Sequence, residues 1–110
     1  MLRGRLIITG VSSGIGKALA EASLEAGYEV LGVGRRSCDV IERHARGQFF
    51  QADLTDPTAV EAIPLLPADS GPTILVNNAG TIGPIASTAE VGYEELAHCI
   101  HLNVVAPMRL

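Results

Sequence analysis

The sequence predicts an α/β fold in which helices cover both faces of a doubly wound parallel sheet. Short apolar runs alternate with segments of helical periodicity, and a glycine-rich turn joins the first run to the first helical segment. Right-handed crossovers between parallel strands would place the first strand near the middle of the sheet. The chain of 110 residues can bury one core but not two, so we expect residues 1–110 to form one domain.

A βαβ unit is predicted at the start of the chain. Residues 5–9 form a short apolar strand that ends at Gly10, and residues 29–34 form a second, buried strand. The helix between them ends at Gly27. Its periodicity assigns the following apolar side chains to one helix face: Ile15, Ala18, Leu19, Ala22 and Ala26.

The middle of the chain continues the alternation. The polar segment 37–47 could form a short helix, and residues 48–51 form the third strand. Asp56 and Pro57 are typical of an N-cap followed by the first helical position. We therefore predict a short helix that ends by Pro64.

A fourth strand and a last helical region follow. Residues 73–76 form an apolar strand, and the helical region begins at Thr88, followed by Glu90 and Val91. Apolar residues continue along it at helical spacing: Tyr93, Leu96, Ile100 and Val104. No internal repeat or change of composition indicates a second domain.

Composition and charge exclude several function classes. The 12 acidic and 8 basic side chains give a formal net charge of −4, and Lys17 is the only lysine, which argues against nucleic acid as a partner. Glycine, proline and asparagine interrupt the uncharged stretch 70–89, so we expect no membrane span, and polar residues near the N-terminus argue against a signal peptide. Cys38 and Cys99 lack the spacing of paired metal ligands, and we expect a reducing, cytoplasmic location.

The turn after the first strand has the composition of a phosphate-binding loop. Its glycines allow a sharp turn and a close approach to a ligand, and the following helix presents unpaired N–H groups. A Walker A loop is excluded because Val11 and Ala18 stand where that motif needs glycine and Ser or Thr. A glycine-rich turn without a ligand is the alternative. The candidate cofactor-binding residues here are Thr9, Gly10, Ser12, Ser13, Gly14, Ile15 and Gly16.

This loop and three later motifs resemble those of the short-chain dehydrogenase/reductase family, whose loop reads Thr-Gly-x-x-x-Gly-x-Gly. Asp53 and Leu54 follow the third predicted strand, and Asn77-Asn78-Ala79-Gly80 follows the fourth. Asn103 stands in a Leu-Asn-Val context in the last helix. The four motifs occur in the order that the family has, and they cover nearly all of the chain. The resemblance implies a Rossmann fold that binds a nicotinamide cofactor.

The resemblance also implies a role for each motif. It places the aspartate motif near the adenine ring and the Asn-Asn-Ala-Gly motif beside the cofactor, and it makes Asn103 the active-site asparagine. Plainer alternatives stay open, because Asp53 could bond to its own backbone, the asparagine pair could form an ordinary strand-end turn, and Asn103 could lie on the helix surface. The cofactor-binding residues that the resemblance adds are Asp53, Leu54, Asn78, Ala79 and Gly80.

We predict no metal site. His98 and His101 are three residues apart in the last helical region, with Cys99 between them. No third ligand is in view, and a metal site needs at least three protein ligands. Solvated or core histidines are the simpler explanation.

The sequence departs from the family in its catalytic segment. Members share a Tyr-x-x-x-Lys segment in which the lysine lowers the pKa of the tyrosine, and neither Tyr28 nor Tyr93 is followed by a lysine four residues later. The strands that complete the second half of the family's sheet are also missing. The sequence therefore looks like the N-terminal, cofactor-binding half of a longer enzyme, truncated after about four strands, and we expect it to be inactive alone.

By resemblance, the complete protein would be an oxidoreductase. It would transfer hydride between the nicotinamide and a small-molecule carbonyl or alcohol substrate, with Asn103 helping to hold a water chain. We expect the full-length protein to be a homo-oligomer. A non-catalytic nucleotide-binding or sensing module of the same fold is the alternative.

The end of the second predicted strand favours NADP(H) over NAD(H). NAD-preferring folds usually place an acidic residue there, which binds the ribose hydroxyls and repels a 2′-phosphate. Gly34 stands at or next to that position, and Arg35 with Arg36 can pair with the phosphate. The alternative is that the two arginines are a solvated loop pair.

Overall fold

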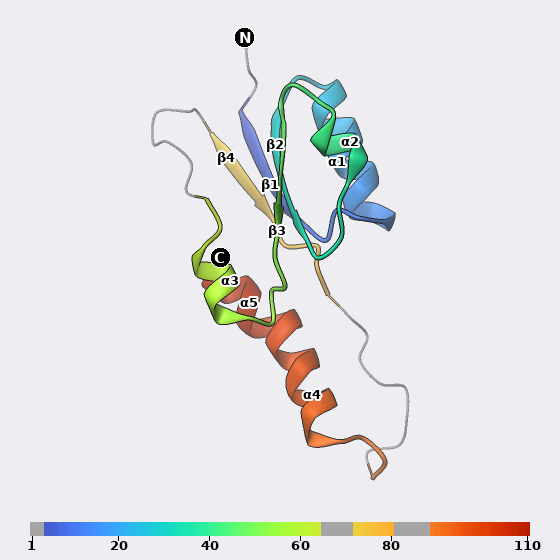
Figure 1. The fold of residues 1–110 in the computed structure, drawn as a ribbon, viewed down its shortest axis with the longest axis vertical. Coiled ribbons are helices and arrows are strands. Elements are labelled where there is room, and N and C mark those ends of the chain that lie inside the picture. Colours follow the sequence, from blue (N-terminus) through green and yellow to red (C-terminus); the bar gives the residue numbers. More distant parts are fainter. Residues whose placement is uncertain (1–3, 65–71, 81–88) are drawn as a thin grey trace.

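The computed structural model describes residues 4–64, 72–80 and 89–110, and within these ranges four strands form one parallel sheet (Figure 1). The strands are β1 (Arg5–Thr9), β2 (Glu29–Gly34), β3 (Gly47–Gln51) and β4 (Thr73–Val76). Their order is β3-β2-β1-β4, so β1 lies inside the sheet as predicted. The predicted α/β class is confirmed.

Helices connect the strands and follow the last one. α1 (Gly14–Glu25) joins β1 to β2, α2 (Asp39–Glu42) joins β2 to β3, and α3 (Pro57–Glu61) follows β3. After β4 come α4 (Tyr93–Ile100), the π-helical segment η1 (His101–Val105) and α5 (Ala106–Arg109). α3 begins as predicted, because Asp56 is its N-cap and accepts a hydrogen bond from the N–H of Thr58 at 3.0 Å.

The parallel register brings the carboxyl ends of the strands to one edge of the sheet. Thr9 of β1 pairs with Val33 of β2, and Gly34 of β2 pairs with Gln51 of β3. β4 runs parallel to β1 on its other side. The loops that leave the four strands therefore converge at this edge, which is where open α/β sheets bind ligands.

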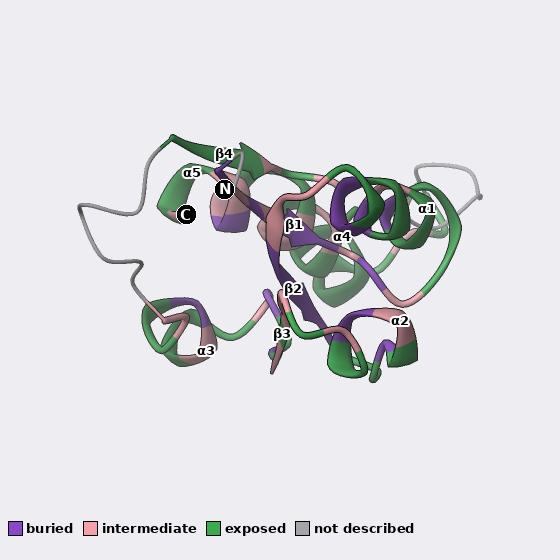
Figure 2. Cartoon of the chain, turned by 90° about the horizontal axis from the view of Figure 1, so that it is seen from above, coloured by how far each residue is buried: buried purple, intermediate pink, exposed green. Residues whose placement is uncertain are grey.

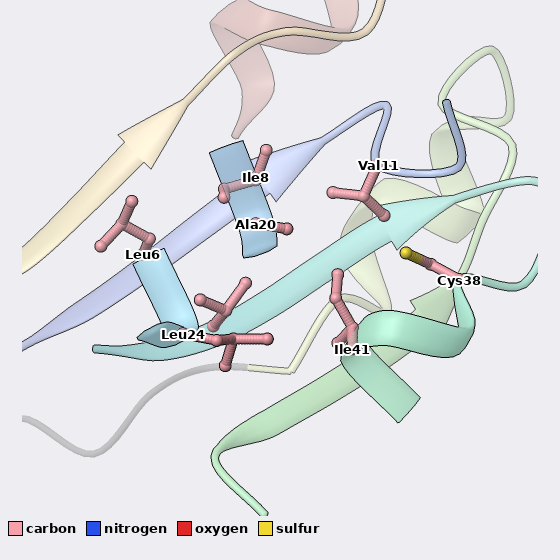
Figure 3. Packing of buried hydrophobic residues seen from close by; sticks show 8 residues of the cluster. Leu6, Ile8, Val11, Ala20, Leu24, Cys38 and Ile41 are labelled. Atoms are coloured by element: carbon pink, nitrogen blue, oxygen red, sulfur yellow. The ribbon is translucent and has the colours of Figure 1, made fainter. Parts of the chain in front are cut away.

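A hydrophobic cluster on each face of the sheet holds the helices in place. Figure 2 shows α1 and α2 on one side of the sheet and α3 and α5 on the other. The cluster under α1 and α2, drawn in Figure 3, contains Leu6, Ile8, Val11, Ala20, Leu24, Val30, Cys38 and Ile41. The cluster on the opposite face contains Leu31, Val33, Ala52, Leu54, Val60 and Ala106.

The face of α1 that packs on the sheet differs from the predicted one. Ile15 is 79% exposed, and Ala18, Ala22 and Ala26 are exposed as well. Of the five residues at helical spacing, only Leu19 is partly buried and packs against the cluster under α1. The buried residues of α1 are Gly16, Ala20, Ser23 and Leu24. Small side chains bring the helix close to the sheet, and the alanines on the exposed face add helix propensity rather than burial. Apolar periodicity did not identify the buried face of α1, because alanine occurs on both its buried and its exposed face.

The last helical region also differs from the prediction. α4 begins at Tyr93 with Gly92 as its N-cap, whereas Glu90 and Val91 precede it and Thr88 lies outside the described residues. The helix points away from the sheet (Figure 1). Its apolar stripe is exposed by 46–85% in this chain and consists of Tyr93, Leu96, Ile100 and Val104.

The predicted absence of a membrane span concerned the stretch 70–89, of which residues 70, 71 and 81–88 lie outside the described ranges. Among the helices that the structure describes, none has the length and apolar character needed to cross a bilayer.

β4 is an edge strand of the described sheet, although its sequence is that of a central strand. Ile74 is 49% exposed and Leu75 is 39% exposed. Edge strands usually carry charges or proline that prevent pairing with another chain, and β4 has neither. The other edge strand, β3, carries polar residues at both ends of its pair of phenylalanines.

We expect a polypeptide of these 110 residues to self-associate through the β4 edge. Sedimentation should show oligomers that Ile74→Lys shifts toward the monomer, because a charge on the edge opposes strand pairing. Gln48→Lys, on the β3 edge, is the matched control and should leave the distribution unchanged. A monodisperse monomer without any substitution would contradict this expectation.

Candidate functional site

A cleft of about 290 Å³ lies at the carboxyl edge of the sheet. The loops after all four strands contribute to its walls, and α4 and η1 contribute one residue each. The residues predicted from the sequence that line it are Gly10, Ser12, Ser13, Arg35, Arg36, Asp53, Leu54, Asn78, Ala79 and Gly80. The structure thus brings together residues as far apart in the sequence as Gly10 and Leu102.

The buried hydroxyl of Thr9 joins the first and fourth of these loops. Its oxygen accepts hydrogen bonds from the backbone N–H groups of Asn78 at 3.0 Å and Ala79 at 2.9 Å. The side-chain amide of Asn78 donates in turn to the carbonyl oxygen of Gly10 at 3.0 Å. Thr9 is 1% exposed, so its predicted place in the site is structural: it fixes the loop instead of lining the cleft.

Two positions of the first loop require glycine, because other parts of the chain approach their backbone closely. Gly10 has φ +71°, and a Cβ there would lie 3.0 Å from the Cα of Ala79. A Cβ on Gly16 would come within 2.1 Å of the carbonyl oxygen of Gly10 and 2.5 Å of the amide nitrogen of Asn78. Larger residues would separate the loop from Asn78 and open the floor of the cleft.

The amino end of α1 faces the same edge of the sheet. Ser13 is the N-cap in an extended conformation, and its side chain makes no capping hydrogen bond. Gly14 has φ +59° at the start of the helix. The N–H groups of the first turn are therefore not capped by Ser13, and such groups together with the helix dipole attract anions.

Arg35 and Arg36 form the wall after β2. The backbone carbonyl of Arg35 accepts a hydrogen bond from the side-chain amide of Gln51 at 3.1 Å, which ties this loop to β3. Both arginine side chains are exposed, and neither forms an ion pair with another described residue. A Cβ on Gly34 would meet nothing closer than 3.7 Å, so the position before them tolerates a Cβ but carries no side chain.

Asp53 both closes its own turn and lines the cleft. Its Oδ1 accepts hydrogen bonds from the hydroxyl of Thr55 at 2.7 Å and from the backbone N–H of Thr55 at 3.0 Å. These bonds, the hydroxyl first, lower the pKa of Asp53 below the ordinary 3.8, and the positive charges of Arg35 and His98 lower it further. The local turn that was the plainer alternative is present, and the carboxylate still faces the cleft.

Asn103 lies beside the cleft without lining it. It sits in η1, and its Oδ1 is 3.1 Å from the position of a Cβ on Gly80, which does line the cleft. Its side-chain nitrogen donates to the sulfur of Cys99 at 3.4 Å. π-helical turns inside α-helices occur frequently at functional sites, because they displace one side chain from the regular spiral.

Several residues that line the cleft were not predicted from the sequence to bind a ligand. Ala52, Val33 and Thr55 are neighbours of predicted residues, and strand ends alone could have suggested them. His98 and Leu102 are one helical turn apart and reach the cleft from the α4 and η1 segments, which only the fold reveals. The predicted residues outside the cleft lining are Thr9, Gly14, Ile15, Gly16 and Asn103.

His98 and His101 do not belong to a metal cluster within the described part of the chain. No group of three or more His, Cys, Asp or Glu side chains there could hold a metal ion. Cys38, buried, and Cys99 are free thiols.

The family model for short chain dehydrogenases matches residues 5–110. The chain belongs to this family. Loop, aspartate, Asn-Asn-Ala-Gly and asparagine motifs all fall within the matched range.

Individual proteins that this chain resembles support its assignment to the short-chain dehydrogenase family. The short chain dehydrogenase ausX of Emericella nidulans is 41% identical over 109 residues, which cover 96% of this chain and 55% of the relative. A short-chain dehydrogenase from Sphingobium yanoikuyae in complex with NADPH is 29% identical with a TM-score of 0.80, over 96% of this chain and 45% of that one. A 4-hydroxyisoleucine dehydrogenase in complex with NADH is 25% identical with a TM-score of 0.81, and the match covers 96% of this chain and 45% of that one.

The chain spans about half the length of the curated relatives that it matches. The matched residues 5–110 contain the glycine-rich loop and all the residues that line the cleft described above.

Replacing Thr9 with valine should destabilise the junction of the first and fourth loops. The substitution keeps the shape of the side chain but leaves the N–H of Ala79 without its acceptor, at a cost of about 1–3 kcal/mol. It also removes one of the two acceptors of the Asn78 N–H, which donates to the carbonyl oxygen of Val76 as well. Urea unfolding of the protein that carries this chain measures the change. Thr9→Ser, which keeps the hydroxyl, should retain most of the stability, and equal losses in the two variants would contradict the role of the hydroxyl.

Proposed function

We propose that residues 1–110 form the dinucleotide-binding part of an NADP(H)-dependent short-chain oxidoreductase. The complete enzyme transfers hydride between the nicotinamide and a carbonyl or alcohol carbon of a small-molecule substrate. The observation that carries the proposal is the cleft at the carboxyl edge of the sheet, where all four loops meet and the Thr9–Asn78 junction holds the first against the fourth.

The cleft fits one nucleotide half of a dinucleotide. Its volume of about 290 Å³ is at the lower end of the range for small-molecule sites. Gly10 and Gly16 let the backbone fold tightly around a phosphate group, and the first turn of α1 supplies N–H donors for it. Asp53 and Leu54 would contact the adenine ring, with Asn78, Ala79 and Gly80 beside the ribose.

The residues after β2 favour a phosphorylated ribose. Gly34 presents no carboxylate to repel a 2′-phosphate, and Arg35 and Arg36 add two positive charges at the cleft wall. Neither arginine is neutralised by an ion pair with a described residue. Family members bind either NADPH or NADH, as the two solved neighbours illustrate, so this wall is where the choice would be made.

The bound nicotinamide would supply or accept the hydride. Asn103 would act on the proton that accompanies it, because its amide can hold a water by donating and accepting hydrogen bonds. Its carboxamide oxygen lies next to the backbone at Gly80, which lines the cleft. The remaining residues of the cleft bind and orient the cofactor.

Arg35→Ala should lower the affinity for NADPH by roughly ten- to a hundredfold and leave the affinity for NADH nearly unchanged. A hydrogen bond to a charged group contributes about 1.5–3 kcal/mol, and NADH lacks the phosphate that would receive it. Gly34→Asp should act in the same direction by repulsion, and its Cβ would meet no atom closer than 3.7 Å. Both cofactors are titrated into the protein that carries this chain at fixed ionic strength.

Arg43→Ala is the matched control for this prediction. Arg43 is an exposed arginine in the same β2–β3 connection, it pairs with Asp39 at 3.8 Å, and it does not line the cleft. Its removal should leave the ratio of the two affinities unchanged. An equal loss with Arg43→Ala, or equal affinities for NADPH and NADH before any substitution, would show that Arg35 and Arg36 are a solvated pair.

A non-catalytic nucleotide-binding module is the second candidate, because the same fold can bind a cofactor without turnover. We expect a polypeptide of these 110 residues to show no turnover of carbonyl substrates with NADPH, since it has no proton donor of that kind, and general acid catalysis contributes roughly 10²–10⁴-fold. Binding of 2′,5′-ADP by the same sample is the control that it is folded. Steady turnover by this polypeptide would contradict the expectation.

A further inference from the structure

One wall of the cleft comes from a helix that carries none of the nucleotide-binding motifs. His98 of α4 lines the cleft together with Arg35, Arg36 and Asp53, which follow β2 and β3. Leu102, one turn further along, lines it as well. The histidine therefore reaches the charged end of the cleft from a segment 45 positions after Asp53.

The orientation of α4 separates this histidine from the apolar stripe. On a regular helix, residues two positions apart point about 160° away from each other. Leu96 and Ile100 are two positions before and after His98, and both lie on the exposed apolar stripe. His98 thus belongs to the opposite face of α4, the one that borders the cleft.

Asp53 interacts electrostatically with Arg35 and His98. The positive charges of Arg35 and His98 both lower the pKa of Asp53, so the three groups lie within electrostatic reach. Arginine stays protonated and Asp53 stays ionised at neutral and mildly acidic pH. Of the side-chain types in this cluster, imidazole is the one that in general changes its charge between about pH 5 and 8.

We propose that His98 is a cofactor-binding residue, and that its protonation strengthens the binding of the 2′-phosphorylated adenosine half of the cofactor. The inference rests on the proposed function of the cleft. The protonated imidazole adds a third positive charge to those of Arg35 and Arg36, against the single negative charge of Asp53. Glu94 and Glu95, one turn before His98 on the same helix, are acidic neighbours that moderate this charge.

The test compares binding of 2′,5′-ADP and 5′-AMP by calorimetry at about pH 5.8 and pH 8. It uses the protein that carries this chain, its His98→Gln variant and its His101→Gln variant. Glutamine keeps hydrogen-bonding groups but cannot become charged. His101 is the matched control, because it is three residues further along and does not line the cleft.

The informative quantity is the ratio of the affinities of the unsubstituted protein and the variant at each pH. The 2′-phosphate also titrates near pH 6, and this ratio cancels its contribution. For 2′,5′-ADP we expect His98→Gln to weaken binding about three- to fivefold more at pH 5.8 than at pH 8, the size of an exposed charge interaction. The difference should be smaller for 5′-AMP, and absent in His101→Gln.

The outcomes separate this inference from the proposed function. If 2′,5′-ADP binds and the loss in His98→Gln is the same at both pH values, the role of His98 is wrong and the nucleotide site stands. If His101→Gln reproduces the effect, the charge acts at long range and His98 is not a cofactor-binding residue. If neither ligand binds to the unsubstituted protein at either pH, the proposed function itself is wrong.

Discussion

The hydroxyl group of Thr9 determines how the functional edge of this chain is arranged. It accepts two backbone hydrogen bonds from a segment 69 and 70 positions later, and so holds the loop after β1 against the loop after β4. Gly10 and Gly16 are needed for the same reason, because a side chain at either would push the two loops apart. Asn78 and Ala79, which this junction holds in place, both line the cleft. A buried polar group that satisfies two others in this way has few substitutes.

The sequence predicted the sheet better than the helices that cover it. The strands at residues 5–9, 29–34 and 73–76 have the predicted bounds, because continuous apolar runs between turn residues have few other interpretations. The buried face of α1 was assigned wrongly. Its position depends on where Gly16 can approach Gly10, a contact across the loop that periodicity does not contain. α4 begins at Tyr93, later than predicted, because the extended backbone of Gly92 makes that residue the N-cap.

The same distinction applies to the site. Residues in motifs that directly follow a strand line the cleft, because the parallel register carries strand ends to one edge. Thr9 could be predicted as part of the motif, but its hydrogen-bond partners could not. No sequence pattern indicates which N–H groups donate to a given hydroxyl oxygen. His98 was considered as a metal ligand or a plain surface residue. Its place in the cleft depends on the packing and rotation of α4, for which the sequence near it gives no signal.

The sequence separation between paired strands has a consequence for how the protein folds. Arg5 pairs with Glu29 on one side and with Thr73 on the other, so β1 meets β2 across a short connection and β4 across a long one. Bringing distant segments together costs more chain entropy, and non-local pairs form later. The β1–α1–β2 unit can thus assemble first, with β4 docking afterwards. Since the Thr9 junction needs β4 in place, we expect the glycine-rich loop to form before the wall that completes the cleft. A ligand that bridges the two would then favour the docking of β4.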